Sequence, residues 1–425
     1  MVEIALPYDK TTVIAHIKEE NLAGILVSRQ SGAQPSAPGA QLVEQSLDAP
    51  IGAPTLEELA KGKKDIVLIS SDHTRPVPSH IITPILLRRL RAAAPGARIR
   101  ILVATGYHRP STAEELAAKY GPEIAAQEEI VMHIAKDDAA MVKIGTLPSG
   151  GELLINRVAA EADLLLAEGF IEAHFFAGFS GGRKSVLPGV ASYRTIMANH
   201  SGEFIADEGS RTGNLRRNLI HEDMVYAARA AKLAFIVNVV LNQRHEIIGS
   251  FAGDVEQAHQ AGCDFLKDLA RVDPVDCDIV IATNSGYPMD QNLYQAVKGM
   301  TAAEATLSHS GVIILVAGCR DGHGGPEFYE LFSKAAGARE YWDGCLACPR
   351  QDTPPEQWQA QVLARVLMRH KVILVSDLVD PALVRGLHME PARTVDEALA
   401  RAYEIMGRDA KVAVIPDGLS VIVNR

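Results

Sequence analysis

Short apolar runs recur along this chain, and each ends in a polar tip, most of which carry Gly or Asp. The runs are apolar throughout rather than alternating, which is typical of strands buried on both faces of a parallel sheet. They cover residues 66–70, 99–104, 164–167, 235–241, 279–282, 312–316 and 372–375. Helices are expected between them at 80–93, 111–120, 221–231, 255–269, 290–299 and 356–369. We therefore predict an α/β fold of two domains with doubly wound, mostly parallel, Rossmann-like sheets.

The length of 425 residues is compatible with about two or three domains. A break is expected near residues 271–277, where the sequence RVDPVDC separates a predicted helix from a predicted strand. We predict an N-terminal domain over residues 1–271, joined by the C-terminal segment 409–425, and a C-terminal domain over residues 272–408.

The tips of the predicted strands carry the charged and histidine side chains that could perform chemistry. In doubly wound sheets, ligands bind beyond the carboxyl ends of the strands. Asp72, His73 and Arg75 follow one strand, His108 follows the next, and His174 follows a third. Arg75 is suited to bind a carboxylate or a phosphate, and His108 is suited to move protons near neutral pH. The alternatives are an Asp72–Arg75 ion pair and a histidine that only bonds its own loop.

A glycine-rich loop surrounds the pair Arg183-Lys184, between His174 and His200. Glycine allows a backbone to approach a ligand closely, so the loop indicates a site for a bulky anionic ligand. One alternative is an ordinary connecting turn. Another is a P-loop-like phosphotransferase that binds nucleotide at 178–185, although GFSGGRKS has Arg183 where the P-loop requires its second Gly.

Two further features extend the candidate site. His200 closes a predicted helix that begins near Ser192, and it is a candidate metal ligand, although one histidine does not make a metal site. In the segment PMDQNLYQAVKG, Tyr294, Gln295 and Lys298 share a helix face through their i,i+3 and i,i+4 spacing. That face suits a substrate carboxylate, and a solvated amphipathic face is the alternative.

Composition disfavours several other classes of function. The formal net charge of −10 disfavours non-specific binding to nucleic acid. No apolar run approaches the roughly 20 residues that span a membrane. Five cysteines, with no secretory leader, predict a cytoplasmic protein. Cys345 and Cys348 form a C-x-x-C pair, for which a zinc site with His323 is an alternative to no metal role.

Several of these segments, in this order, resemble the nickel-dependent lactate racemase family. The resemblance covers nearly the whole chain. It rests on His200 and on four motifs: DHTRP at 72–76, GYHRP at 106–110, EAHFFAGFSGGRKSVLPG at 172–189 and YQAVKG at 294–299. Separated motifs in a conserved order make this resemblance far more specific than any single loop.

The resemblance implies a cofactor and the residues that hold it. Family members carry nickel(II) in a pyridinium-3,5-bisthiocarboxylic acid mononucleotide-type pincer, joined to a lysine that corresponds to Lys184. The nickel is held by two sulfurs, a pyridinium carbon and a histidine that corresponds to His200; this donor set suits Ni(II). The tip that holds the nucleotide end of the cofactor corresponds to Asp72, His73, Thr74 and Arg75.

The resemblance also implies a reaction, the interconversion of 2-hydroxy acid enantiomers through a 2-keto acid. His108 and His174 correspond to the two catalytic histidines, each of which serves one enantiomer. The contacts to the substrate correspond to Arg75, Tyr294, Gln295 and Lys298. No basic residue adjoins Phe175 and Phe176, which favours lactate or a similar monocarboxylate. The cofactor-synthesis enzymes are implied partners, and the oligomeric state stays open. No early G-x-G-x-x-G indicates an ordinary nicotinamide dehydrogenase.

Overall fold

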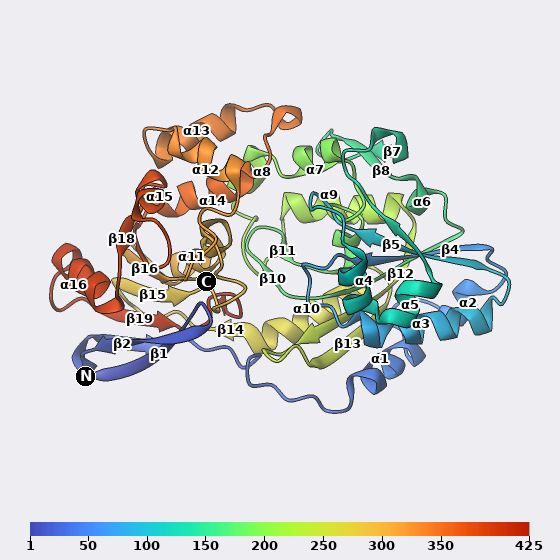
Figure 1. Ribbon diagram of the computed structural model, residues 1–425, viewed down its shortest axis with the longest axis horizontal. Coiled ribbons are helices and arrows are strands. Elements are labelled where there is room, and N and C mark those ends of the chain that lie inside the picture. Colours follow the sequence, from blue (N-terminus) through green and yellow to red (C-terminus); the bar gives the residue numbers. More distant parts are fainter. Residues whose placement is uncertain (425) are drawn as a thin grey trace. The chain divides into compact units, whose positions relative to one another are not determined.

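The computed structural model describes residues 1–424, which form two compact units. The N-terminal unit contains Gln30–His200 and Glu208–Leu269. The C-terminal unit contains Met1–Arg29, Ser201–Asp207 and the residues from Ala270 onward. Each unit is built on a six-stranded sheet covered by helices, so the predicted α/β fold with parallel-rich sheets is confirmed (Figure 1).

The sheet of the N-terminal unit has the strand order β13-β12-β9-β4-β5-β6. All neighbouring pairs are parallel except β12 and β13, which pair antiparallel. The strands are β4 (Asp65–Ser71), β5 (Arg98–Ala104), β6 (Glu129–Met132), β9 (Leu164–Phe170), β12 (Leu233–Leu241) and β13 (Ile247–Gly253). Two small antiparallel pairs join β7 (Met141–Thr146) to β8 (Glu152–Asn156) and β10 (Ala173–His174) to β11 (Gly178–Phe179).

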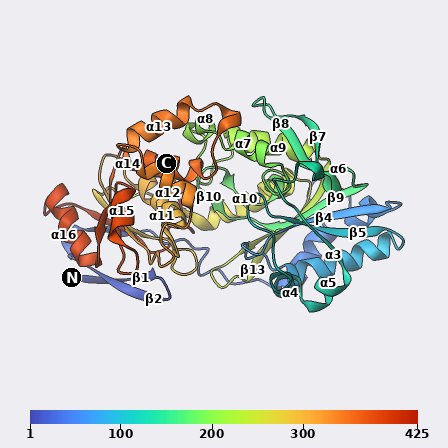
Figure 2. The ribbon, with the colours of Figure 1, turned by 45° about the horizontal axis from the view of Figure 1, so that its top comes forward.

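Helices cover both faces of this sheet. Figures 1 and 2 show α3 on one face and α9 on the other. A core of buried Ile, Leu and Val side chains from α1, α2 and α3 packs against the sheet on the α3 side. The helices of this unit are α1 (Gly39–Asp48), α2 (Leu56–Ala60), α3 (Ser79–Ala93), α4 (Ala113–Tyr120), α5 (Pro122–Gln127), α6 (Arg157–Ala160), α7 (Tyr193–Asn199), α9 (Leu219–Ala230) and α10 (Gln257–Ala270).

The sheet of the C-terminal unit is parallel throughout, in the order β18-β17-β16-β15-β19-β3. Its strands are β3 (Leu22–Ile25), β15 (Ile279–Thr283), β16 (Val312–Val316), β17 (Lys371–Val375), β18 (Glu390–Ala392) and β19 (Val412–Ile415). A short parallel pair joins β14 (Arg271–Val272) to β20 (Ile422–Val423). The helices are α8 (Gly202–Ala206), α11 (Leu293–Thr306), α12 (Pro326–Ser333), α13 (Ala338–Ala347), α14 (Gln357–Leu367), α15 (Pro381–Gly386) and α16 (Val395–Met406).

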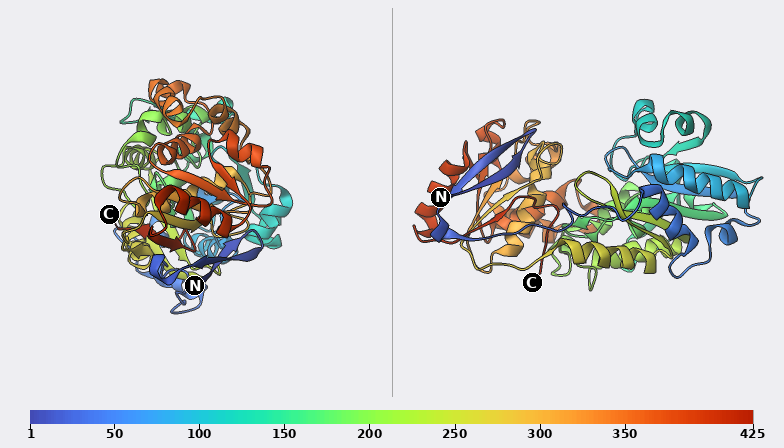
Figure 3. Two further views of the ribbon diagram at one scale, coloured as in Figure 1. Left: turned by 90° about the vertical axis from the view of Figure 1, so that its left-hand side faces the viewer. Right: turned by 90° about the horizontal axis from the view of Figure 1, so that it is seen from below.

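Both ends of the chain lie in the C-terminal unit. The N-terminal hairpin of β1 (Val2–Tyr8) and β2 (Thr11–Ile17) packs against α16, although the two segments are far apart in the sequence (Figures 1 and 3). Strand β19 pairs with β15 on one side and with β3 on the other.

This arrangement differs from the predicted ranges, which placed residues 1–29 and 409–425 with the N-terminal domain. Hydrogen bonding across the sheet decides where these segments belong, and the composition of a strand does not name its partner. Residues 201–207, which were predicted in the N-terminal domain, also belong to the C-terminal unit, and the last division between the units falls after Leu269. Among the helices of residues 1–424, none combines the length and the apolar character needed to cross a membrane.

Candidate functional site

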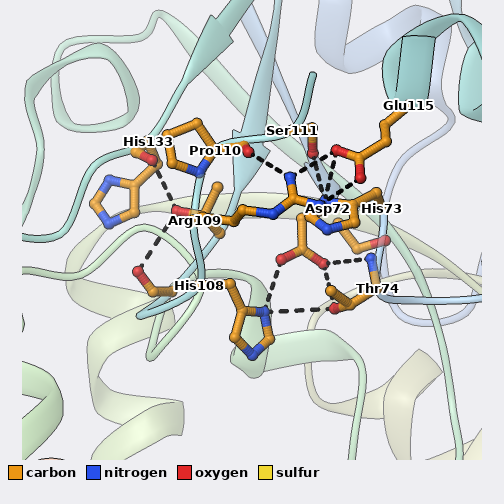
Figure 4. Close-up of polar contacts among 12 residues, drawn as sticks. Asp72, His73, Thr74, His108, Arg109, Pro110, Ser111, Glu115 and His133 are labelled. Carbon is orange, nitrogen blue, oxygen red and sulfur yellow. Dashed lines mark hydrogen bonds and ion pairs between the residues drawn. The ribbon is translucent and has the colours of Figure 1, made fainter. Parts of the chain in front are cut away.

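The tips after β4 and β5 in the N-terminal unit are joined by Asp72 and His108 (Figure 4). Asp72 Oδ2 lies 2.7 Å from His108 Nδ1, and Oδ1 accepts hydrogen bonds from the backbone N–H and the hydroxyl of Thr74 at 3.1 and 2.6 Å. Asp72 is 1% exposed, whereas His108 is exposed. Burial acts to raise the pKa of Asp72, but the hydrogen bond and charge of His108 outweigh it and lower that pKa to about 2. Asp72 therefore stays ionised and fixes the orientation of the His108 ring.

A second bridge joins the same two tips through His73 (Figure 4). Its Nδ1 lies 2.9 Å from Ser111 Oγ and 3.5 Å from Glu115 Oε2. Arg109 donates to both carboxylate oxygens of Glu115, at 2.8 and 2.6 Å. Glu115 also closes a capping box with Thr112 at the start of α4. His73 and Arg109 thus hold the two loops together.

A buried carboxylate lies beneath these tips, at the end of β9. Glu168 is 1% exposed and accepts hydrogen bonds from Ser70 at 2.6 Å, Ser79 at 2.5 Å and Thr83 at 3.2 Å. The buried Lys119 donates to Ser71 at 3.1 Å, and burial lowers its pKa. Sequence reasoning assigned no role to Glu168 or Lys119. The only sequence signal for such a site is that Glu168 directly follows an apolar run. Its hydrogen-bond partners come from distant segments, so the sequence does not indicate them.

Lys184 and His200 lie around one aromatic ring, that of Phe176. The Lys184 Nζ is 5.9 Å from the ring centroid, and the His200 ring meets Phe176 edge-on with 5.3 Å between centroids. The His174 ring lies against the same side chain, with 4.5 Å between centroids. Phe176 is 3% exposed. The loop thus brings together three of the predicted site residues.

His174 and His108 are held in opposite ways. In the β10–β11 turn, the backbone N–H of Ala177 donates to Nδ1 of His174 at 3.3 Å. This bond requires an unprotonated Nδ1, so the neutral His174 ring carries its proton on Nε2. The carboxylate of Asp72 requires a proton on Nδ1 of His108, which leaves Nε2 as the basic nitrogen. The two neutral rings therefore hold different tautomers, with the proton on Nε2 of His174 and on Nδ1 of His108.

His200 has the chemistry of a metal ligand. It caps the C-terminus of α7, and its Nδ1 lies 3.1 Å from the carbonyl of Ile196. Burial, followed by the nearby charge of Lys184, lowers the pKa of His200 to about 3. The ring is neutral at physiological pH, and a proton on Nδ1 directs Nε2 toward a metal. Within residues 1–424 no group of three or more His, Cys, Asp or Glu side chains could hold a metal.

The loop at 178–185 does not have the geometry of a P-loop. A P-loop leads from a strand into an α-helix whose N-terminus binds phosphate. Here β11 contains only Gly178–Phe179, and the following turn is a 3-10 helix over Gly182–Ser185. The backbone N–H of Gly182 donates to the Asn238 side chain at 2.6 Å, so it is already bound.

Tyr294, Gln295 and Lys298 lie on the first turns of α11, in the C-terminal unit. The Tyr294 hydroxyl accepts a hydrogen bond from the indole N–H of Trp358 at 3.1 Å. The backbone carbonyl of Tyr294 accepts a hydrogen bond from the Gln359 side chain. Gln295 Oε1 is buried and has no hydrogen-bond partner within the described part of the chain. Such an oxygen is costly unless a ligand binds it.

The C-x-x-C pair lies at the end of α13 in the same unit. Burial raises the pKa of the Cys345 thiol to about 12, so this thiol is protonated near neutral pH. Within residues 1–424, this pair and His323 are not part of any group of three or more side chains that could hold a metal.

Comparison with known proteins gives concordant matches over the whole chain. Models of the lactate racemase N-terminal and C-terminal domains match residues 8–213 and 272–423. A lactate racemase of Lactiplantibacillus plantarum is 65% identical over 100% of both chains. A lactate racemase of Thermoanaerobacterium thermosaccharolyticum is 49% identical over 100% of this chain and 99% of its own.

Solved structures agree with these matches. The lactate racemase apoprotein from Thermoanaerobacterium thermosaccharolyticum superposes with a TM-score of 0.96 and covers 100% of both chains at 49% identity. A Thermotoga maritima protein with 18% identity has a TM-score of 0.65, covers 92% of this chain and 100% of its own, and shares the fold alone.

Proposed function

This chain belongs to the lactate racemase family, and from that premise we propose that it is an isomerase that interconverts the enantiomers of lactate or a similar 2-hydroxy monocarboxylate. The observation that carries the proposal is the convergence of His174, Lys184 and His200 on the ring of Phe176. The proposal includes a cytoplasmic location and dependence on the cofactor-synthesis enzymes.

The residues around Phe176 fit the nickel-pincer cofactor implied by the resemblance. Lys184 would carry the covalent link, and the neutral imidazole of His200 would bind the nickel. When bound, the cofactor supplies a reversible hydride acceptor for C2 of the substrate. The polar tip of Asp72, His73, Thr74 and Arg75 would hold the nucleotide end.

The two histidines would handle the hydroxyl proton. Nε2 of His108 is the basic nitrogen in the tautomer that Asp72 selects, so it can take the hydroxyl proton of one enantiomer. Nε2 of His174 would give a proton to the 2-keto acid from the charged ring when the other enantiomer forms, and the neutral ring would take that proton from the hydroxyl in the opposite direction. The roles exchange in the reverse reaction. Arg75, Tyr294, Gln295 and Lys298 would bind the substrate carboxylate and hydroxyl, and the apolar Phe175 and Phe176 suit the methyl group of lactate.

The covalent link gives the direct test of the cofactor. Protein produced together with the cofactor-synthesis enzymes is expected to carry an adduct in its intact mass, with close to one nickel per chain. Lys184→Ala should have the mass of the bare polypeptide, because no amine remains at that position. Chiral assays over a panel of 2-hydroxy acids then identify the substrate. An unmodified wild-type mass without nickel, while a known racemase is loaded in the same cells, would refute the proposal.

Asp72 gives a second test, because two roles for it lead to different results. If it orients His108, Asp72→Asn should load cofactor normally and lower kcat by about 10–100-fold, the effect typical of lost supporting hydrogen bonds. The amide of the Asp72→Asn variant can donate its NH2 group to Nδ1 of His108. This favours the His108 tautomer with its proton on Nε2, which cannot accept the hydroxyl proton there. If Asp72 instead binds the cofactor, the adduct itself should be lost. Intact mass and kcat measured on the same preparation separate the two roles.

A further inference from the structure

Arg183 is a buried cation without a buried anion beside it. It is 1% exposed, and within residues 1–424 no carboxylate forms an ion pair with it. Burial lowers its pKa to about 10, which still leaves it charged at neutral pH. Burying an unpaired charge is costly, so hydrogen bonds must offset that cost.

Those hydrogen bonds go to the backbone of the loop that precedes Lys184. The guanidinium donates to the carbonyls of Ala177 at 2.7 Å, Gly181 at 3.3 Å and Ser180 at 3.5 Å. Nε donates to Nδ1 of His221 on α9 at 3.0 Å. Its NH1 also lies 3.0 Å from His259 Nε2 on α10, which in turn lies 2.8 Å from the carbonyl of Ser180. One side chain therefore connects the turn to two helices.

The backbone of Lys184 shares one of these acceptors. Its N–H donates to the carbonyl of Gly181 at 3.1 Å, which is the same oxygen that Arg183 binds. The backbone of this turn is tightly constrained. Gly181 and Gly182 adopt φ of +78° and +52°, in the left-handed region that favours glycine. A Cβ at Gly182 would lie 2.8 Å from the His259 ring. The conformation that presents Lys184 is thus fixed by contacts to Arg183 and to the groups that Arg183 binds.

We infer that Arg183 is a positioning residue that folds the 177–183 turn and so places the Lys184 amine where the cofactor is attached. The inference rests on the proposed function, in which Lys184 carries the cofactor. Only a planar fork with several donors can bind three carbonyls and an imidazole together, so lysine cannot replace it. A turn ordered before attachment avoids the entropy cost of ordering it during attachment.

The experiment compares Arg183→Met with wild type and with Arg100→Met. Arg100 is also largely buried in the N-terminal unit, and it pairs with Asp65 at the amino ends of β5 and β4, the opposite end from the tips. All three proteins are produced with the cofactor-synthesis enzymes, and intact mass gives the fraction that carries an adduct. Hydrogen exchange of the apo proteins gives the local order of residues 177–186.

Arg183→Met is expected to reduce the adduct fraction by about 10-fold, while Arg100→Met loads as wild type does. The amides of 177–186 should exchange faster in Arg183→Met, and those of β12 should not. Normal loading, or unchanged exchange in the loop, would overturn the inference. If Arg183→Met does not fold, Arg183→Lys, which keeps charge and bulk, takes its place with the same expectations. A wild type without adduct would refute the proposed function, and the apo exchange data would still decide the role of Arg183 in the turn.

Discussion

Replacing His174 by alanine in the loaded enzyme is expected to lower kcat for racemisation by about 10²–10⁴-fold, the usual contribution of a positioned acid or base. His108→Ala should have an effect of similar size. Both rings serve every full turnover, because one exchanges a proton with the incoming hydroxy acid and the other with the outgoing one. The measurement is kcat from a chiral assay, normalised to the fraction of protein that carries the adduct. Loading should be retained, because Lys184 and His200 are intact in both variants.

The half-reaction distinguishes the two histidines. Two enantiomers have equal free energies, so kcat/KM must be equal in both directions for any variant, and steady-state rates cannot assign a histidine to an enantiomer. A single turnover of each enantiomer, quenched and assayed for 2-keto acid, can do so. His108→Ala should form keto acid at the normal rate from one enantiomer only, and His174→Ala from the other. Equal loss with both enantiomers in both variants would contradict the assignment of one base to each face.

Acid is expected to destabilise the apo protein through the buried His133 and His259 and the partly buried His221. Burial lowers the pKa of His133 to about 4 and that of His221 to about 3, the latter also through the charge of Arg183. Burial, followed by the charge of Arg183, places the pKa of His259 well below its usual value. The folded protein thus keeps all three neutral, whereas the unfolded chain takes up their protons below about pH 6.5. The unfolded state binds more protons, so the free energy of unfolding falls as the pH falls.

The expected loss is about 1.4 kcal/mol per histidine for each pH unit below 6.5, or about 4 kcal/mol between pH 7.5 and 5.5 for these three. The buried His200, whose pKa is lowered to about 3, adds a similar amount per histidine in the apo protein. Carboxylates with lowered pKa values, such as Asp72, lose their contribution only near pH 4 and below, outside this window. Urea unfolding of the apo protein at the two pH values measures the difference. His221→Gln keeps an acceptor for Arg183 and should remove about 1.4 kcal/mol of the difference, while replacement of the exposed His80 is the matched control. A stability that is independent of pH in this range would contradict the prediction.

Much of the fold follows from local sequence. The run at 312–316 is apolar throughout because β16 is buried between two parallel neighbours, and its predicted bounds match the observed Val312–Val316. Thr112 and Glu115 cap α4 within a few residues of each other, so a local pattern is sufficient to place that helix start. His200 closes α7 as its position predicts.

Part of the candidate site is also local. The motif from His174 to Lys184 is short enough that its residues converge on Phe176. His108 and Asp72 were each expected at a strand tip, because parallel strands end at one edge of their sheet. Their hydrogen bond could not be predicted, since it depends on β4 and β5 being neighbours in the sheet.

The sequence by itself determined the α/β class, the central apolar strands and several of the helices, and the side chains that reach the tips, because each depends on a pattern within about ten residues. It did not predict strands such as β6, β13 and β18. The tertiary structure decided what those side chains bind. It joined β19 to β3 and so moved both chain ends into the C-terminal unit. It surrounded Glu168 with three hydroxyl groups that donate hydrogen bonds to it. It also connected Arg183 to a loop and to histidines on two helices. A hydrogen bond between segments distant in the sequence depends on their separation in space, which no local pattern specifies.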